Sequence, residues 1–395
     1  MPVTEPVIVG ASGATLRTAD GRELIDCASA AFGYQYPVVR EAVSAQLSVL
    51  PQSTRMFLNR PLADLVRHLA ESTPGDLAVT YPANSAAEAM EGALKLALGY
   101  HRRSGRRGFV ATLGSDHGGS GGAMSVSRLG SPERAEVAGA PIDVAFVRFG
   151  DTTELRRAVE RARPAAAVLE PIATGEGLTV PPAGYLSAVR EICDESGALL
   201  IVNETITGLG RTGARFAVDA ENVVPDVLVL GGALGGGVLP VGAYVTRAAI
   251  NRRVYGRRGP WLHGSTTGGN PLACVAAVSV LDVMEREDLP GRSRINARRI
   301  RQSLNDIHLR HADVVKSVAS VGQLAAITFH DPASARGAAS QARAHGVLAW
   351  EGALDRGVLG LRPPLICTGA ELERALDGIR AAVDAVGTVA EERIA

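Results

Sequence analysis

Acidic, amide and imidazole side chains follow several short apolar runs in the middle of the chain. They are Asp116, His117, Glu170, Asn203 and Glu204. Carboxylates and imidazoles transfer protons in enzymes, and an amide can orient a neighbour or a ligand by hydrogen bonding. These residue types therefore predict general acid/base chemistry, provided that the fold brings the ends of the runs together.

The apolar runs alternate with amphipathic helical patterns from about residue 60 to residue 285. The expected strands are residues 108–113, 144–149, 166–170, 199–204, 227–230 and 242–246, and helices are expected over residues 152–162 and 185–196. Continuous apolar strands favour a doubly wound, mostly parallel sheet with helices on both faces. Ligands bind beyond the carboxyl ends of such strands, so the polar side chains should converge on one crevice.

The pattern changes near residue 285 and predicts a second domain. Beyond it we expect a helix at 292–309, a strand at 324–329, and helices near 334–345 and 370–386. Three segments follow from this: residues 1–55 pack with the small domain, residues 56–285 form the large α/β domain, and residues 286–395 form the small C-terminal α/β domain.

Composition narrows the class of protein. The chain has 395 residues, of which 46% are hydrophobic, and its formal net charge is zero. No basic stripe is visible, which argues against nucleic acid and anionic membranes as partners. There is neither a signal peptide nor an apolar run of membrane-spanning length, so we expect a cytoplasmic protein. The four cysteines are far apart and predict no metal site.

Four stretches together resemble the class III aminotransferases. They are PANSAAEAMEGALKLA (82–97), the long stretch from LEPIATGEG to GLGRTG (169–213), PDVLVLGGALGGGVLPVGA (225–243) and HGSTTGGNPLACVAA (263–277). The resemblance implies the type I fold of pyridoxal-phosphate-dependent transferases, with a mostly parallel large-domain sheet and a small C-terminal α/β domain. It also implies a homodimer with active sites at the interface.

The family's Schiff-base lysine has no counterpart at its expected position. The family stretch resembles L-G-K-G-L-G-G-G, whereas residues 230–237 read LGGALGGG, with Gly232 in place of the lysine. Lys95 follows Glu91 at the spacing of a solvated helical ion pair, and Lys316 lies in the small domain. Transamination needs that amine both to hold the cofactor and to move the α-proton. We therefore expect that transamination has been lost.

Three other family contacts to the cofactor differ as well. Asn203 replaces the carboxylate that keeps the pyridine nitrogen protonated, and Asp116 replaces the aromatic ring that stacks on the cofactor. Ser85 is followed by two alanines instead of the Gly-Thr or Gly-Ser that help a helix N-terminus to bind phosphate. Each loss is worth about 1.5–3 kcal/mol of binding. We therefore expect a degraded pyridoxal-phosphate site and no cofactor.

A substrate pocket is expected in the vacated space. Asp116 is the first candidate for general acid or base, because burial would raise its pKa; a solvated loop carboxylate without a role is the alternative. His117, Glu170 and Glu204 are further catalytic candidates. For His117 and Glu204, which the family also carries, the alternative is an inherited structural role.

The candidate substrate-binding residues come from several segments. Family members often carry an arginine for the substrate α-carboxylate at the position of Gly360, and Arg362 lies two residues later. Thr266 belongs to a loop that reaches the neighbouring subunit's site in this family. The full set is Asn203, Gly232, Ser85, Thr266 and Arg362.

Three functions follow from this combination of an intact frame and an altered site. The first is an enzyme that runs cofactor-independent acid/base chemistry on a small molecule, of isomerase, lyase or cyclase type, in a biosynthetic setting. The second is a non-catalytic partner subunit of an active class III aminotransferase. The third is an enzyme that uses non-covalently bound pyridoxamine or pyridoxal phosphate.

Overall fold

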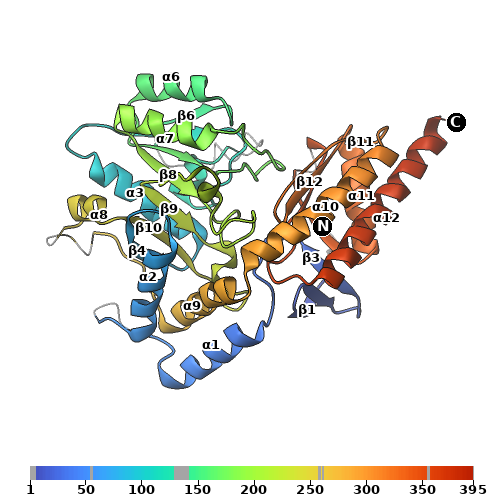
Figure 1. The fold of residues 1–395 in the computed structure, drawn as a ribbon, viewed down its shortest axis with the longest axis horizontal. Coiled ribbons are helices and arrows are strands. Elements are labelled where there is room, and N and C mark those ends of the chain that lie inside the picture. The colour runs from blue at the N-terminus through green and yellow to red at the C-terminus, as the bar shows by residue number, and fades with distance from the viewer. Residues whose placement is uncertain are drawn as a thin grey trace.

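The computed structural model describes residues 6–53, 57–128, 142–256, 259, 262–353 and 356–394. These residues form two seven-stranded sheets, each with its own helices. Figure 1 shows them side by side, with the N-terminal strands next to the C-terminal elements. No helix among the described residues is long and apolar enough to cross a membrane.

The larger sheet has the strand order β4-β10-β9-β8-β7-β5-β6. Its strands are β4 (Leu77–Ala83), β5 (Phe109–Thr112), β6 (Val144–Val147), β7 (Ala166–Leu169), β8 (Leu199–Asn203), β9 (Val227–Leu230) and β10 (Gly242–Arg247). Strands β5 to β9 pair in parallel, and all of them except the partly buried edge strand β6 are fully buried. This confirms the expected mostly parallel sheet.

Two strands at one edge differ from the expectation. Strand β10 pairs antiparallel with both β9 and β4, and β4 was not expected from the sequence. The link between β9 and β10 contains only the short 3₁₀ helix η2 (Gly232–Gly235), which cannot form the crossover that a parallel partner needs. Strand β4 contains Thr80 and Pro82 and is only partly buried, which hid it among the continuous apolar runs.

Helices cover both faces of this sheet. They are α1 (Pro37–Val49), α2 (Arg60–Ser72), α3 (Ala86–Tyr100), α4 (Gly121–Ser125), α6 (Thr152–Ala162), α7 (Tyr185–Ser196), η1 (Ala217–Glu221), α8 (Ala248–Val254) and α9 (Pro271–Arg286). Helices α3, α4 and α8 share one apolar core, and α2, α6, α7 and α9 share another. Helices α6 and α7 have the predicted bounds.

The smaller sheet joins the two ends of the chain in the order β1-β2-β3-β13-β14-β12-β11. Its elements are β1 (Ile8–Ser12), β2 (Thr15–Thr18), β3 (Glu23–Cys27), α10 (Leu289–Arg310), β11 (Val315–Val321), β12 (Leu324–Phe329), α11 (Pro332–Ala344), β13 (Val347–Ala353), β14 (Val358–Leu361) and α12 (Gly369–Ile394). Strand β3 pairs in parallel with β13, so early residues complete the late sheet.

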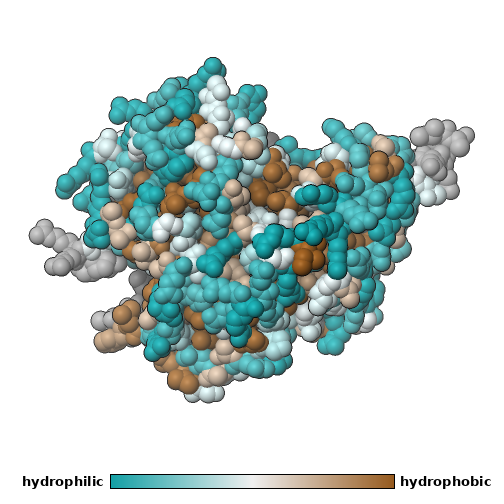
Figure 2. All heavy atoms as spheres, viewed as in Figure 1, coloured by the Kyte–Doolittle hydropathy of each residue, from teal (hydrophilic) through white to brown (hydrophobic). Residues whose placement is uncertain are grey.

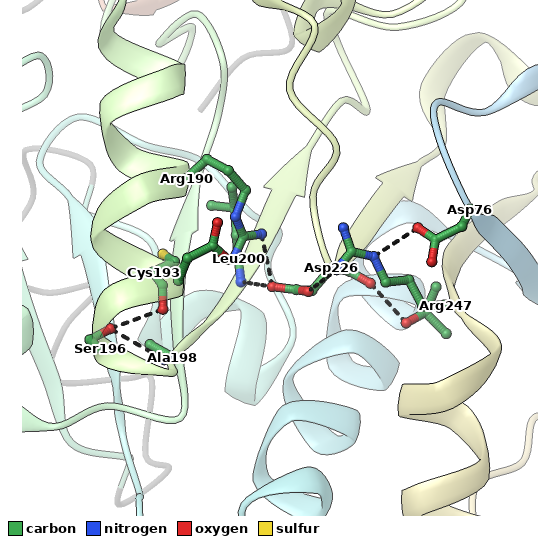
Figure 3. Close-up of polar contacts among 10 residues, drawn as sticks. Asp76, Arg190, Cys193, Ser196, Ala198, Leu200, Asp226 and Arg247 are labelled. Atoms are coloured by element: carbon green, nitrogen blue, oxygen red, sulfur yellow. Dashed lines mark hydrogen bonds and ion pairs between the residues drawn. The ribbon is translucent and has the colours of Figure 1, made fainter.

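A buried carboxylate fastens the amino ends of the central strands. Figure 3 shows Asp226, just before β9, between Arg190 of α7 and Arg247 of β10. Its carboxylate accepts hydrogen bonds from Arg190 Nη1 (2.9 Å), Arg247 Nη1 (3.2 Å) and the Leu200 backbone N–H (2.8 Å). This network lies at the edge opposite to the strand ends that carry the candidate site.

Arg211 fastens the carboxyl side of the sheet to other segments. Its guanidinium is fully buried and donates to the backbone carbonyls of Pro363 (2.6 Å), Ala30 (2.6 Å) and Ala31 (2.9 Å). Burial lowers its pKa to about 9, so the group stays protonated at neutral pH. One side chain therefore holds the loop after β8 against both the N-terminal and the C-terminal segments.

Candidate active site

The loop after β5 brings His117 against the end of β8. The His117 backbone N–H donates to Ser127 Oγ (2.8 Å), and its Nδ1 lies 3.1 Å from Asn203 Nδ2. Asn203 Nδ2 also donates to the Asp116 carbonyl (3.1 Å), while Asn203 Oδ1 accepts from the Thr205 backbone N–H (3.1 Å). If the Asn203 amide were turned the other way, its Oδ1 would face the Asp116 carbonyl oxygen and repel it. These contacts therefore fix the amide and make His117 Nδ1 an acceptor.

His117 is consequently a neutral imidazole that carries its proton on Nε2. Burial lowers its pKa to about 3, so it does not accept a second proton at neutral pH. Nε2 is buried without a hydrogen-bond partner among the described residues. The side chain can donate one hydrogen bond from that atom, and its contacts suit a positioning role for the loop.

Asp116 differs from its expected environment. Its side chain is exposed in the single chain rather than enclosed by apolar walls. Its Oδ1 accepts a hydrogen bond from the Gly118 backbone N–H (3.1 Å). The Asp116 carboxylate is therefore accessible from solvent, while the Asp116 backbone carbonyl is bonded to Asn203.

Glu170 lies beneath this loop and is 2% exposed. Its carboxylate accepts hydrogen bonds from Thr174 Oγ1 (2.5 Å) and from the backbone N–H groups of Asp116 (3.3 Å) and Thr174 (3.4 Å). Burial raises its pKa to about 7, although these donors act in the opposite direction. Glu170 can therefore exist in either protonation state near neutral pH. Thr174 was not a sequence candidate, although it follows Glu170 within the same short motif.

Arg362 reaches this cluster from the small domain. It donates from Nη2 to the Thr174 carbonyl, and its guanidinium carbon lies 3.7 Å from the centre of the Trp350 ring. Burial lowers its pKa to about 10 while the charges of Glu170 and Asp116 act in the opposite direction, so it stays protonated at neutral pH. Its positive charge is therefore close enough to interact with both carboxylates of this cluster.

Trp350 is a second residue that sequence reasoning missed. It pairs with Gly360 across β13 and β14, and a Cβ at Gly360 would lie 2.6 Å from the indole. The ring also covers Gly352, where a Cβ would lie 2.3 Å from it. In the sequence, the glycines at positions 352 and 360 near Trp350 could have indicated that a large ring packs against bare backbone. The indole thus covers the backbone at position 360 and supports Arg362.

Glu204 does not join this cluster. Its carboxylate accepts hydrogen bonds from the backbone N–H groups of Ala217 (2.8 Å) and Val218 (2.9 Å) and from Thr207 Oγ1 (2.9 Å). Burial raises its pKa to about 7 despite these donors. The contacts cap the first turn of η1, which agrees with the structural interpretation of this residue.

Gly232 has a backbone that suits glycine. Its φ is +53°, in the left-handed region, and a Cβ there would lie 2.6 Å from the Thr205 carbonyl oxygen. That distance is shorter than a real contact, so any side chain would require the two loops to move apart. The preceding Gly231 faces α3, since its Cβ would lie 2.6 Å from the Ala86 methyl.

The first turn of α3 is closed by small apolar groups. Ser85 caps the helix by accepting from the Glu88 backbone N–H (3.1 Å). The Ala86 methyl packs toward Gly231, and the Ala87 methyl lies 2.8 Å from where a Cβ of Gly118 would be. The methyl groups therefore fill the gaps between the helix and both loops.

The loop with Thr266 lies beside this helix start. Ser265 Oγ accepts from Asn84 Nδ2 (2.6 Å), and Thr267 Oγ1 donates to Asn84 Oδ1 (2.9 Å). Thr266 itself is exposed between these anchored neighbours. The structure thus brings together Asp116, His117, Glu170, Asn203 and Arg362, and it leaves Glu204 in a separate environment. No group of His, Cys, Asp and Glu suited to a metal occurs within the described ranges.

The architecture of the two domains defines the class of protein. A mixed sheet with helices on both faces, followed by a small α/β domain, is the type I fold of pyridoxal-phosphate-dependent transferases. The sequence profile of the Aminotransferase class-III family matches residues 2–383, which is nearly the whole chain. The chain therefore belongs to the class III aminotransferase family.

Solved structures agree with this assignment. The ornithine aminotransferase from Toxoplasma gondii ME49 is 30% identical, with a TM-score of 0.89 over 98% of this chain and 91% of that one. The acetylornithine aminotransferase from Elizabethkingia anophelis is 26% identical, with a TM-score of 0.81 over 96% and 94%. An amine transaminase from an uncultivated Pseudomonas species, in its pyridoxal-phosphate-bound internal aldimine form, is 27% identical, with a TM-score of 0.88 over 97% and 95%.

Proposed function

We propose that this chain is an enzyme of the class III aminotransferase family that has lost pyridoxal-phosphate catalysis and performs acid/base chemistry on a small molecule. The observation that carries the proposal is Gly232. It offers no amine, its φ is +53°, and its surroundings leave no space for a Cβ. A chain built in this way has no lysine to form an imine at that position.

The other residues around this position do not fit the cofactor either. A pyridine nitrogen needs a carboxylate partner, whereas the Asn203 amide is already bonded to His117, the Asp116 carbonyl and Thr205. A phosphate needs exposed N–H groups at a helix start, and the Ala86 and Ala87 methyls pack there instead. The proposed chemistry therefore does not use pyridoxal phosphate.

The acid/base part of the proposal rests on Asp116 and Glu170. Asp116 presents an exposed carboxylate that can take a proton from, or return it to, a bound substrate. Glu170 holds the Asp116 backbone N–H from below and shares the site with the Arg362 cation. Arg362 would bind an anionic group of the substrate. The reaction class that these groups suit is isomerisation, elimination, cyclisation or decarboxylation.

Pyridoxal-phosphate labelling tests the first part of this proposal. The purified chain is incubated with excess pyridoxal phosphate, treated with borohydride and mapped by peptide mass spectrometry. We expect no visible absorption band and no reduced adduct in the candidate site, because an adduct requires an amine there. A stable adduct on Lys95 that supports turnover of an amino donor would overturn the proposal.

The proposed enzyme is a homodimer with sites at the interface. Large apolar side chains are exposed at the end of α1 and before α2, including Val49 (79%), Phe57 (70%) and Leu58 (85%). Figure 2 shows brown groups over α1 at the lower edge of the molecule. The anchored but exposed Thr266 favours a second candidate, in which this chain completes the site of an active relative.

A further inference from the structure

Arginines gather where α3 and α8 end, at a distance from the candidate active site. Arg102 and Arg103 follow α3, and Arg252 and Arg253 form the last turn of α8. All of these side chains are exposed. Both helices direct the negative ends of their dipoles toward the cluster, which favours cations there.

Two hollows lie between these side chains. The first, of about 400 Å³, is lined by Arg102, Arg103, Arg253 and Tyr100 with Gly99. The second, of about 440 Å³, is also lined by Arg102 and Arg253, together with Arg252. Since they share two walls, the hollows adjoin each other, and no described carboxylate lines either of them.

The positive charge here has no local counter-charge among the described residues. No ion pair joins Arg102, Arg103, Arg252 or Arg253 to a described carboxylate. The guanidinium of Arg253 lies 4.3 Å from the centre of the Tyr100 ring, which supports its position.

Charged groups next to the two hollows include both cations and a carboxylate. The pKa of the nearby His101 is lowered by burial and then by the charges of Arg106 and Arg253, while the charge of Asp226 acts in the opposite direction. A third hollow, next to Arg106 and Arg107, is also lined by Asp143. The two hollows beside α8 thus differ from the third in having no described carboxylate in their lining.

We propose that the two adjoining hollows bind a compact polyphosphate, that is, an anion with two or more linked phosphate groups. Guanidinium groups bind phosphate oxygens through paired hydrogen bonds, and two hollows that share arginine walls match two neighbouring phosphates. Free inorganic polyphosphate and a nucleoside polyphosphate share this chemistry. Two hollows that span only a few side chains favour such a ligand over an extended nucleic acid strand.

This site is separate from the proposed catalytic one. Helix α3 has 15 residues and runs from the Ser85 turn to the arginines, which places the two sites about 22 Å apart along its axis. Binding in the hollows therefore does not depend on the chemistry assigned to Asp116. Asp116→Asn should leave the affinity for polyphosphate unchanged.

Calorimetric titration of the full chain with inorganic tripolyphosphate, and separately with ATP, tests the proposal. We expect both anions to saturate one site per chain and to bind more weakly at about 300 mM than at about 50 mM NaCl. The double variant Arg102→Gln/Arg253→Gln should weaken both by roughly tenfold or more. Arg298→Gln/Arg301→Gln, two exposed arginines of α10, changes the net charge equally and should have no effect.

Several results would overturn the proposal. They are absence of saturable binding, equal loss of affinity in both double variants, and binding of ATP without any binding of tripolyphosphate. A single-stranded oligonucleotide that binds more tightly than ATP, with affinity rising with its length, would assign the surface to nucleic acid instead.

Discussion

At the scale of single residues, Gly232 separates this chain's proposed chemistry from transamination. The sequence places a glycine at position 232, but it does not reveal the backbone conformation of that glycine. The φ of +53° and the nearby Thr205 carbonyl add that the loop is shaped around glycine. Substitution at this position should therefore change the stability as well as the chemistry.

Gly232→Lys should fail to produce a transaminase and should destabilise the chain. A side chain in the left-handed region costs about 1–2 kcal/mol, and the close approach to Thr205 adds to this cost. Transamination assays and urea unfolding measure the two effects. Gly119→Lys is the matched control, since open space surrounds Gly119. Substantial transamination by Gly232→Lys would show that Asn203 and the alanines after Ser85 are compatible with the cofactor.

Asp116 and Glu204 should respond differently to loss of charge. Asp116→Asn should reduce turnover of the natural substrate by roughly 10²–10⁴-fold, because it removes proton transfer while keeping the shape. Its melting temperature should barely change, since the side chain is exposed. Glu204→Gln should lower the melting temperature, because the carboxylate caps backbone N–H groups of η1. Full activity of Asp116→Asn with loss in Glu204→Gln would reverse the assignment.

Glu170 should make stability depend on pH in a known direction. Its folded pKa of about 7 exceeds the ordinary 4.5, so its contribution is complete below about pH 4.5 and is lost as pH rises through 7. Above pH 7 the ionised Glu170 lowers the free energy of unfolding by up to roughly 3 kcal/mol. In urea unfolding, the stability of Glu170→Gln relative to wild type should therefore increase from pH 5 to pH 8. An equal difference at both values would contradict the buried, proton-binding carboxylate.

At the scale of elements, the most regular segments were predictable and the irregular ones were not. Helices α6 and α7 and strand β12 have the bounds that their periodicity indicated. The antiparallel β4 escaped notice because a partly buried strand with a proline lacks a continuous apolar run. The loops of the site could be assigned to strand ends, yet the φ of +125° at Gly118 and its close approach to Ala87 were not predictable from the sequence.

The Asp226 network should contribute more to the sheet than its exposed neighbours do. Asp226→Ala would leave Arg190 and Arg247 without their buried partner and should cost about 3–5 kcal/mol of unfolding free energy. Asp194 is the other partner of Arg190, and the Asp194 side chain is 65% exposed. Asp194→Ala should therefore cost under about 1 kcal/mol of unfolding free energy. Urea unfolding compares them, and similar losses would contradict the role given to burial.

At the scale of the whole molecule, a net charge of zero does not exclude a local cluster of positively charged side chains. The formal net charge is zero and no basic stripe is visible in the sequence, which argued against nucleic acid and anionic membranes as partners. Arg102 and Arg253 are far apart in sequence, and only the meeting of α3 and α8 places them in shared hollows. The net charge cannot show this cluster, because it carries no information about where the charged side chains lie. The family and its two-sheet architecture, by contrast, could be predicted, because long sequence motifs of the family are present and belong to one fold.

The proposed homodimer gives a test at the same scale. Leu58→Asp should shift the chain toward monomers in light scattering, because it adds a charge to the apolar surface near α1. Leu309→Asp, at a side chain of α10 that is 79% exposed, is the control and should leave the mass unchanged. An unchanged mass for Leu58→Asp would place the interface elsewhere.

The pairing of β3 with β13 also has a consequence for biosynthesis. Ile25 lies opposite Val347, so the first strands have to wait for more than 300 further residues before their partner exists. At about 5–20 residues per second, ribosomes take roughly 15–60 s to supply it. During that interval β3 presents a strand edge without its partner β13. Chaperones that cover such edges are therefore expected to bind the nascent chain until its last quarter has been made.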